Sequence, residues 1–245
     1  MEEGRRKRRT KVDIENLLLK VAHSLIAEKG FNAITLRAIT QKARIEPIVF
    51  YNRYDDMENF LDEFVKEYDY WLAELNAEYK GNLCSLEGYK KILNGLFDSL
   101  YEDKIMQQLL RWEVSTDNPT TQRTAGLREF HTIPLVSTFK ELFKETPVCI
   151  EGVSALIIGG IYYLITHARL SHFAGIDINT EEGRATIHQS IDCLAELLFN
   201  YIHPQQEIIN IIQRMKEKGL EPSLIAEYTG LEENIIQKYL SSSEL

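Results

Sequence analysis

Apolar residues recur at helical spacing along most of the chain, and no stretch shows the alternation of apolar and polar residues that marks a half-buried strand. The clearest stripe lies near the N-terminus and consists of Ile14, Leu17, Leu18, Val21, Ala22, Leu25 and Ile26. Lys29 supplies a basic last turn and Gly30 a C-cap, so we expect the first helix to end there. The pattern predicts an all-α protein.

Two short helices separated by a tight turn follow the first one. Thr35 carries a hydroxyl suited to an N-cap and precedes a helix that ends at about residue 43. After a gap at residues 44–46, Pro47 favours the first position of another helix. Helix, tight turn and helix in this order predict a helix-turn-helix.

The helix that begins at Pro47 has two faces of different character. Phe50 and Tyr54 are four residues apart, so they share the face that must pack against Ile39 and the first helix. We expect the opposite face to contact something outside the protein, because a DNA major groove admits a helix that carries such groups. The side chains of this face are Ile48, Val49, Tyr51 and Asn52.

The rest of the chain reads as further helices with breakers between them. We expect helices at about residues 57–80, 86–101, 103–115, 119–145, 148–173 and 180–202, the fourth kinked or interrupted by Pro134. A tail then has a helix before Gly219, a short helix from Pro222 to Thr229 and a last helix from Glu232. We therefore divide the chain into residues 1–56, 57–203 and 204–245.

Charge separates the N-terminal part from the remainder. The chain has a net charge of -9, but residues 1–54 carry 12 Lys and Arg and 6 Asp and Glu side chains, a charge of +6. Residues 55–245 carry 16 basic and 31 acidic side chains, a charge of -15. A basic module on an acidic body is typical of nucleic-acid binding by the N-terminal part. The basic run from Arg5 to Lys11 is either an arm for a minor groove or a solvated tail.

The sequence offers no sign of catalysis, of a cofactor or of a metal site, so we expect a protein that is not an enzyme. It contains no GxSxG, GxxxxGK[ST], GxGxxG or HExxH motif. His167 and His172 are five residues apart, off the spacing that would place both on one helical face.

Cysteine usage and hydropathy favour the cytoplasm. Cys84, Cys149 and Cys193 form no CxxC pair, which indicates neither a disulfide framework nor a zinc site. The charged N-terminus is unlike a signal peptide. The apolar run from Val153 to Thr166 is shorter than the roughly 18 residues that span a bilayer, so we expect no membrane contact.

One stretch carries a family resemblance. The segment LIAEKGFNAITLRAITQKARIEPIVFYNRYDDMENFL resembles the N-terminal domain of the TetR family of bacterial transcriptional regulators, and the resemblance covers about residues 14–65. The matching features are EKGF-x-x-x-T-hydrophobic-x-x-I and the helix pattern P-x-x-hydrophobic-Y-x-x-aromatic. The resemblance implies a helix-turn-helix DNA-binding domain followed by a larger helical domain for ligand binding and dimerisation.

The resemblance also implies which residues contact double-stranded DNA: Thr35 and Tyr51 at phosphates, and residues 48, 49, 52 and 53 near bases or backbone. The residue types agree, because Asn pairs with adenine, aliphatic side chains contact thymine methyl groups and Arg neutralises phosphates. They predict an A·T-rich half-site. The expected DNA-binding residues are Thr35, Arg37, Arg44, Pro47, Ile48, Val49, Tyr51, Asn52 and Arg53.

Some positions depart from the family pattern. Arg44 stands where a turn Gly is usual, which costs on the order of 1 kcal/mol in a left-handed conformation. Thr40 replaces a small Ala, and Asp55, Asp56 and Met57 stand where a phosphate-binding Lys is common. Two carboxylates repel a DNA strand, although Asp56 suits an N-cap. These departures motivate the alternative of a non-DNA-binding helical dimer that acts as an interaction protein.

Two glycines point to an interface between helices. Gly159 and Gly160 cost a predicted helix roughly 1 kcal/mol each, which close approach of another helix would offset. The resemblance implies a homodimer with a four-helix bundle, and monomer core is the other interpretation. A two-fold dimer sets two recognition helices roughly 34 Å apart on a palindromic operator. The expected interface residues are Gly159, Gly160, Ile187, Ile191, Leu194 and Leu198.

The resemblance further implies a pocket for a small-molecule effector whose identity the sequence does not give. Aromatic walls with a few polar groups are typical of such sites, although each candidate is also a possible core residue. The candidates are Tyr101, Arg111, Trp112, Phe130, His131, Phe139, Tyr163 and His167.

The tail adds one more resemblance. IAEYTGLEENII is similar to a compact unit of transposase-like proteins and small helix-turn-helix modules. Its last helix has Glu232, Glu233 and Glu244 but only Lys238, so a packing or partner-binding appendage is expected and a nucleic-acid-processing enzyme is the weakest interpretation. We expect a sequence-specific transcriptional regulator, a repressor released from its operator by a small-molecule inducer.

Overall fold

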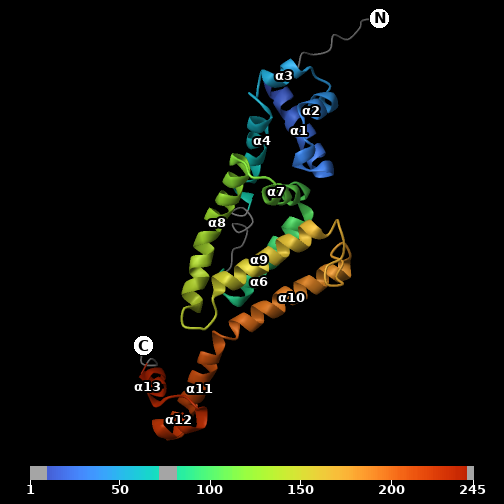
Figure 1. The fold of residues 1–245 in the computed structure, drawn as a ribbon. Helices are drawn as coiled ribbons and strands as arrows, with labels where there is room; N and C mark the ends of the chain where they lie inside the picture. The colour runs from blue at the N-terminus through green and yellow to red at the C-terminus, as the bar shows by residue number, and fades with distance from the viewer. Residues whose placement is uncertain (1–9, 72–81, 242–245) are drawn as a thin grey trace, which may run out of the picture.

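The computed structural model describes residues 10–71 and 82–241, with the side chains of 203–207 and 241 left out. The basic run before Thr10 therefore lies outside the described residues. Where the structure describes the chain, its regular elements are helices, and one isolated bridge joins Phe173 to Ile176. The predicted all-α class is confirmed. A head lies at one end, a body of longer helices in the middle and a tail at the other end (Figure 1).

The first helix of the head begins at Lys11, with Thr10 as its N-cap. The Thr10 hydroxyl accepts a hydrogen bond from the Asp13 N–H at 3.1 Å, and the Asp13 carboxylate accepts one from the Thr10 N–H at 2.8 Å. This capping box fixes the start of the first helix. The head helices are α1 (Lys11–Lys29), α2 (Leu36–Ala43), α3 (Pro47–Tyr51) and α4 (Met57–Val65).

The helix expected over residues 57–80 is wrong in its length. α4 ends at Val65, and a 3-10 turn at Lys66–Tyr68 follows it. The part of the expected helix beyond residue 71 lies outside the described residues. The turn has a structural role, because it brings Asp69 to an arginine on another helix.

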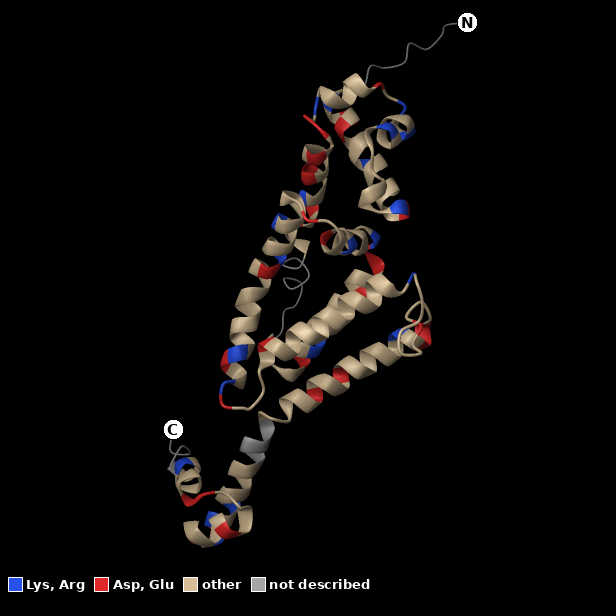
Figure 2. Cartoon of the chain, in the orientation of Figure 1, with Lys and Arg blue, Asp and Glu red and all other residues tan. Residues whose placement is uncertain are grey.

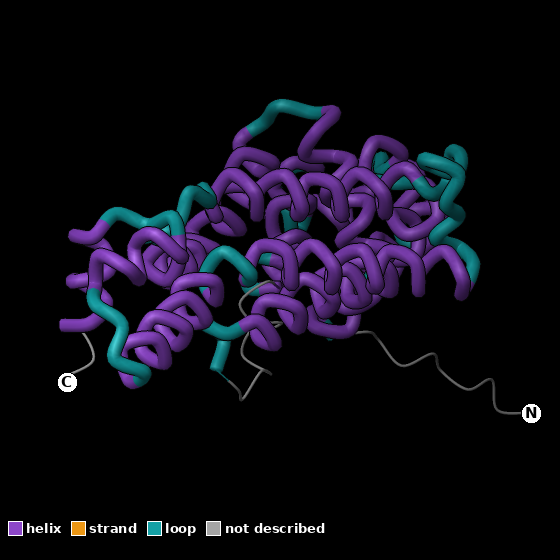
Figure 3. Tube along the Cα trace, turned by 90° about the horizontal axis from the view of Figure 1, so that it is seen from below, coloured by secondary structure: helices purple, strands orange, loops and turns teal. Residues whose placement is uncertain are grey.

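The body contains α6 (Leu86–Glu102), α7 (Lys104–Ser115), α8 (Pro119–Phe143), α9 (Ile150–His167) and α10 (Glu181–Phe199). These bounds agree with the predicted helices within a few residues, except that α9 stops short of residue 173. α8 continues through Pro134, so the expected interruption does not occur. α9 packs against α6, α7 and α8, while α10 packs against α6 (Figures 1 and 3).

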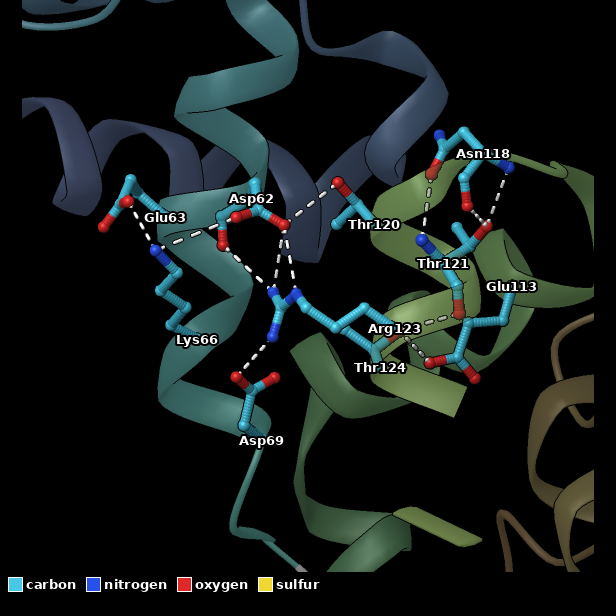
Figure 4. Close-up of polar contacts among 10 residues, drawn as sticks. All are labelled: Asp62, Glu63, Lys66, Asp69, Glu113, Asn118, Thr120, Thr121, Arg123 and Thr124. Atoms are coloured by element: carbon cyan, nitrogen blue, oxygen red, sulfur yellow. Dashed lines mark hydrogen bonds and ion pairs between the residues drawn. The ribbon is translucent and has the colours of Figure 1, made fainter. Parts of the chain in front are cut away.

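The head packs on the body through α1 and the turn after it, which contact α7, and through α4, which contacts α8. The ring of Phe31 stacks on the ring of Trp112 in α7, with 4.6 Å between centroids and an interplanar angle of 5°. The guanidinium of Arg123 in α8 forms ion pairs with Asp62, at 3.1 Å, and with Asp69 (Figure 4). Thr120, one turn earlier on α8, donates a hydrogen bond to Asp62 at 3.1 Å. The end of α4 and the turn after it are thereby fixed to α8.

The tail forms a small helical unit around its own core. Its helices are α11 (His203–Glu217), α12 (Pro222–Thr229) and α13 (Glu233–Ser241), as the sequence predicted. Ile212, Ile225 and Ile236 are fully buried between them. Like α2, α12 has 8 residues and is separated from the next helix by three residues, of which the first is left-handed. The tail therefore has helix-turn-helix geometry with an acidic surface.

We predict that Arg123→Met destabilises the protein, because Asp62 and Asp69 then lose their cation and Asp69 has only 11% of its side chain exposed. The free energy of unfolding in urea should fall by about 1–3 kcal/mol. Lys144→Met, at the C-cap of the same helix, is the control. Its pair with Glu141 is more than half exposed, so the expected loss is below about 0.5 kcal/mol. Equal stability of the two variants would contradict the role of Arg123.

Candidate nucleic-acid interface and ligand cleft

An aromatic cluster packs under the inner face of α3 and leaves its outer face exposed to solvent. Phe50 has no exposed surface, and its ring lies 5.3 Å from the ring of Phe60, while Tyr54 lies 4.8 Å from Phe60. This confirms the predicted packing of Phe50 and Tyr54 into the head. With that face buried, Ile48 is 63% exposed and Tyr51 is 52% exposed.

α3 is shorter than expected, because it ends at Tyr51 and Asn52 forms its C-cap. Asn52 remains exposed, and Val49 is half-buried beside it. Pro47 occupies the first position of α3, as predicted, and is also exposed. The structure therefore brings Pro47, Ile48, Tyr51 and Asn52 to one short exposed segment.

The start of α2 contributes polar groups beside this segment. The Thr35 hydroxyl accepts a hydrogen bond from the Ala38 N–H at 3.1 Å, so its own proton is free to be donated to a phosphate. Arg37 is exposed on the first turn. Thr40 is only 6% exposed and donates to the carbonyl oxygen of Leu36 at 2.8 Å. This hydrogen bond explains how a hydroxyl is accommodated where a small Ala was expected.

The turn between α2 and α3 has a left-handed residue, as the sequence predicted. Arg44 has φ 54° and ψ 54°, and its side chain is exposed. Figure 2 shows basic residues on α2 and beside it at the outer end of the head. Lys42 is engaged there by Ser24, at 2.8 Å, and by Glu28, at 3.3 Å. Hydrogen bonds from Ser24 and Lys42 lower the pKa of the Glu28 carboxyl.

Arg53 is placed differently from the other expected contacts. It is half-buried, and its Nη1 donates to the carbonyl oxygen of Val49 at 2.9 Å. This hydrogen bond engages Nη1 at the end of α3, and the contact of Arg53 with DNA stays a prediction. Asp55 and Asp56 are exposed, and Asp56 caps α4 by accepting from the Asn59 N–H at 2.7 Å, as predicted.

A cleft of about 1080 Å³ lies among α7, α8 and α9. Of the residues expected at a ligand pocket, it brings together Arg111, Tyr163 and His167. A smaller cavity of about 60 Å³ is lined in part by Phe139 and shares wall residues with the cleft. One larger and one smaller space therefore meet inside the body.

The other expected pocket residues lie elsewhere, because helix rotation could not be fixed from spacing alone. Trp112 belongs to the contact with Phe31 in the head, and Tyr101 lies under the guanidinium of Arg184 at 4.9 Å. Phe130 is 66% exposed, and the ring of His131 lies 5.3 Å from that of Tyr70. These four positions are corrected.

Sequence reasoning missed a buried polar group in the cleft wall. Glu113 of α7 forms an ion pair with Arg128 of α8, and the Thr124 hydroxyl donates to Glu113 at 2.7 Å. Tyr162 lies nearby, and burial raises the pKa of its hydroxyl. The two adjacent tyrosines in α9 could have indicated Tyr162 as a pocket residue. No spacing in the sequence shows that Glu113 and Arg128 form an ion pair.

The expected dimer residues divide into two groups. Gly159 and Gly160 are exposed, no heavy atom of another part of the chain lies within 4 Å of a Cβ built on either, and Leu194 is 45% exposed. In contrast, Ile187 and Ile191 are 7% and 4% exposed in the single chain, and Leu198 is half-buried against its core. Ile187 and Ile191 therefore pack within the chain, and the place of Leu198 at a dimer interface stays a prediction.

Exposed apolar side chains accompany the glycines of α9. Leu156 is 79% exposed, and Leu197 and Tyr201 at the end of α10 are 55% and 52% exposed. By length and composition alone, α9 meets the requirement for a membrane span, contrary to the sequence expectation, although only 17% of that window is buried. One such helix is weak evidence, so it does not by itself indicate a membrane protein.

Known proteins resemble both the head and the whole fold. Residues 18–64 match the family described as bacterial regulatory proteins, tetR family. The ketosteroid transcriptional regulator KstR2 of Mycobacterium tuberculosis has a TM-score of 0.53 at 17% identity, over 74% of this chain and 93% of that chain. A TetR-family regulator from Mesorhizobium loti has 0.53 at 13% identity, over 79% and 98%. No curated protein matches the sequence.

A third solved structure gives the same result. The TetR-family transcription regulator from Marinobacter aquaeolei VT8 has a TM-score of 0.50 at 17% identity, over 73% of this chain and 93% of that chain. These identities establish a shared fold and no shared ligand. Residues 18–64 therefore match the N-terminal domain of the TetR family, and the chain has the fold of TetR-family transcriptional regulators.

Proposed function

We propose that this protein is a sequence-specific DNA-binding repressor in the cytoplasm, which a small-molecule inducer releases from a palindromic operator. The exposed segment Pro47 to Asn52 carries the proposal, because an aromatic cluster fixes it and its groups are those that read a major groove. Thr35, Arg37 and Arg44 surround it as phosphate contacts. The positive charge of residues 1–54 supports the same orientation on DNA.

A homodimer would place two such segments on one operator. The support is the exposed surface of α9 at Gly159 and Gly160, where a second helix can approach closely because no side chain intervenes. Leu156, Leu194 and Leu197 would be buried by the same contact. Burial of these side chains would contribute about 25 cal/mol for each Å² of apolar surface removed from water.

Release by an inducer requires that the cleft and the head communicate. Thr120 and Arg123 hold Asp62 of α4, and Thr124 on the next position of α8 holds Glu113 in the cleft wall (Figure 4). One turn of α8 thus contacts both regions. We propose that ligand and operator favour different positions of this turn, so that each weakens the binding of the other by the same factor.

We predict preferential binding of the purified protein to DNA from upstream of its own gene over random DNA, measured by fluorescence anisotropy. Asn52→Ala should lose about 1–3 kcal/mol of this discrimination, since the amide is the group suited to adenine. Tyr51→Phe should weaken binding to both DNAs by the same factor, because the lost hydroxyl is assigned to a phosphate contact. Binding of all three proteins equally and weakly to a random pool would favour the interaction protein.

A variant of Arg44 should change the salt dependence of DNA binding in the same anisotropy measurement. Arg44→Gly removes a proposed phosphate contact, so affinity should fall on every DNA and the slope of log K against log salt should decrease by about 1. The fold should tolerate the change, because Gly adopts φ 54° without strain. An unchanged slope of log K against log salt would show that Arg44 does not contact a DNA phosphate.

We predict that Gly159→Leu weakens the dimer, because a leucine side chain prevents the close approach of a second α9. Gly126→Leu on α8 is the matched control, since this glycine is also exposed with no heavy atom of another part of the chain within 4 Å of its Cβ position. Sedimentation velocity should show dissociation of the first variant at concentrations where the second remains dimeric. Identical behaviour would place the interface elsewhere.

A further inference from the structure

The cleft contains an arginine whose charge is not neutralised by the wall around it. Nε and Nη2 of Arg111 donate to the carbonyl oxygen of Thr166 at 3.1 and 2.8 Å, near the end of α9. Its Nη1 is buried and has no hydrogen-bond partner among the described residues. A buried donor without a partner is rare in folded proteins and needs an explanation.

The charged group that acts on Arg111 is of the same sign. Burial lowers the pKa of the Arg111 guanidinium, and repulsion by Arg169, which also lines the cleft, lowers it further. Two cations at one end of a concave site attract an anion, and the two guanidinium groups suit a carboxylate better than any neutral group.

The acidic residues of the cleft are mostly engaged. Glu113 is paired with Arg128, and Glu151 is paired with Lys140 at 2.7 Å. Glu129 is the remaining acid of the lining and lies exposed on α8. The wall therefore leaves two cations, Arg111 and Arg169, against one unpaired acid, Glu129, which is an excess of positive charge.

The part of the cleft that adjoins the smaller cavity is largely apolar. Val136 and Ile158 line both spaces, and Leu93, Leu96 and Phe139 line the smaller one. Apolar walls that lead away from a charged end fit a molecule with one polar head and a hydrocarbon body. The volume of about 1080 Å³ is at the upper end of the range for small-molecule sites.

We infer that the cleft binds an amphipathic carboxylate, whose head group is held by Arg111 and Arg169 and whose apolar body lies toward Ile158 and Phe139. This inference names the chemical class of the proposed inducer and rests on the proposed function for its regulatory role. The head group sits where Arg111 of α7 meets the end of α9.

The test is calorimetric titration of the full chain with three probes that share one tail: decanoate, decan-1-ol and decylamine, each below its micelle concentration. We expect decanoate to bind at least tenfold more tightly than decan-1-ol and decylamine to bind weakest. Arg111→Met and Arg169→Met should each reduce the preference for decanoate, the first to less than about threefold. Arg184→Met is the control, since Arg184 also donates to carbonyl oxygens but lies outside the cleft lining.

The outcomes separate the ligand class from the regulation. Equal binding of decanoate and decan-1-ol, or preference for decylamine, would overturn the inference and leave DNA binding untouched. If Arg111→Met does not fold, as judged by circular dichroism, the Arg169→Met variant and the comparison of the three probes on the unmodified protein test the inference instead. Decanoate binding that depends on both arginines but leaves operator affinity unchanged would support the ligand class and contradict release by an inducer.

Discussion

The contact between Arg123 and the two carboxylates Asp62 and Asp69 is the constraint on which the arrangement of this protein depends. It fixes the end of α4 to α8, while Phe31 stacks on Trp112 a short distance away. α1 also packs on α7, so apolar packing holds the head in addition to this polar contact. The end of α4 is distinct within the head, because charged and polar side chains join it to α8.

This arrangement gives the cleft a physical route to the head. Glu113 and Arg128 form part of the cleft wall, and Thr124 links Glu113 to the turn of α8 that also holds α4. A ligand that moves α7 relative to α8 would act on Glu113 first and on Asp62 next. The unbalanced charge of Arg111 and Arg169 is on the α7 and α9 side of the same cleft, where a carboxylate would draw these helices together.

The sequence predicted the parts of the structure that are set by local rules. The stripe of α1, the Thr35 cap, the left-handed Arg44, Pro47 and the burial of Phe50 follow from helical spacing, capping and turn chemistry. The cleft was only partly predictable, because its walls depend on how three helices rotate against one another. Trp112 was expected at a ligand and packs on Phe31 instead, and Ile187 was expected at a partner and packs within the chain.

The most direct test of the account is selection of binding sites from a random oligonucleotide pool by the purified protein. The account predicts an enriched A·T-containing inverted repeat, with half-sites separated by about one helical turn and lost in the Asn52→Ala variant. A pool that yields no enriched sequence, although the protein is folded and dimeric, would contradict sequence-specific DNA recognition by α3.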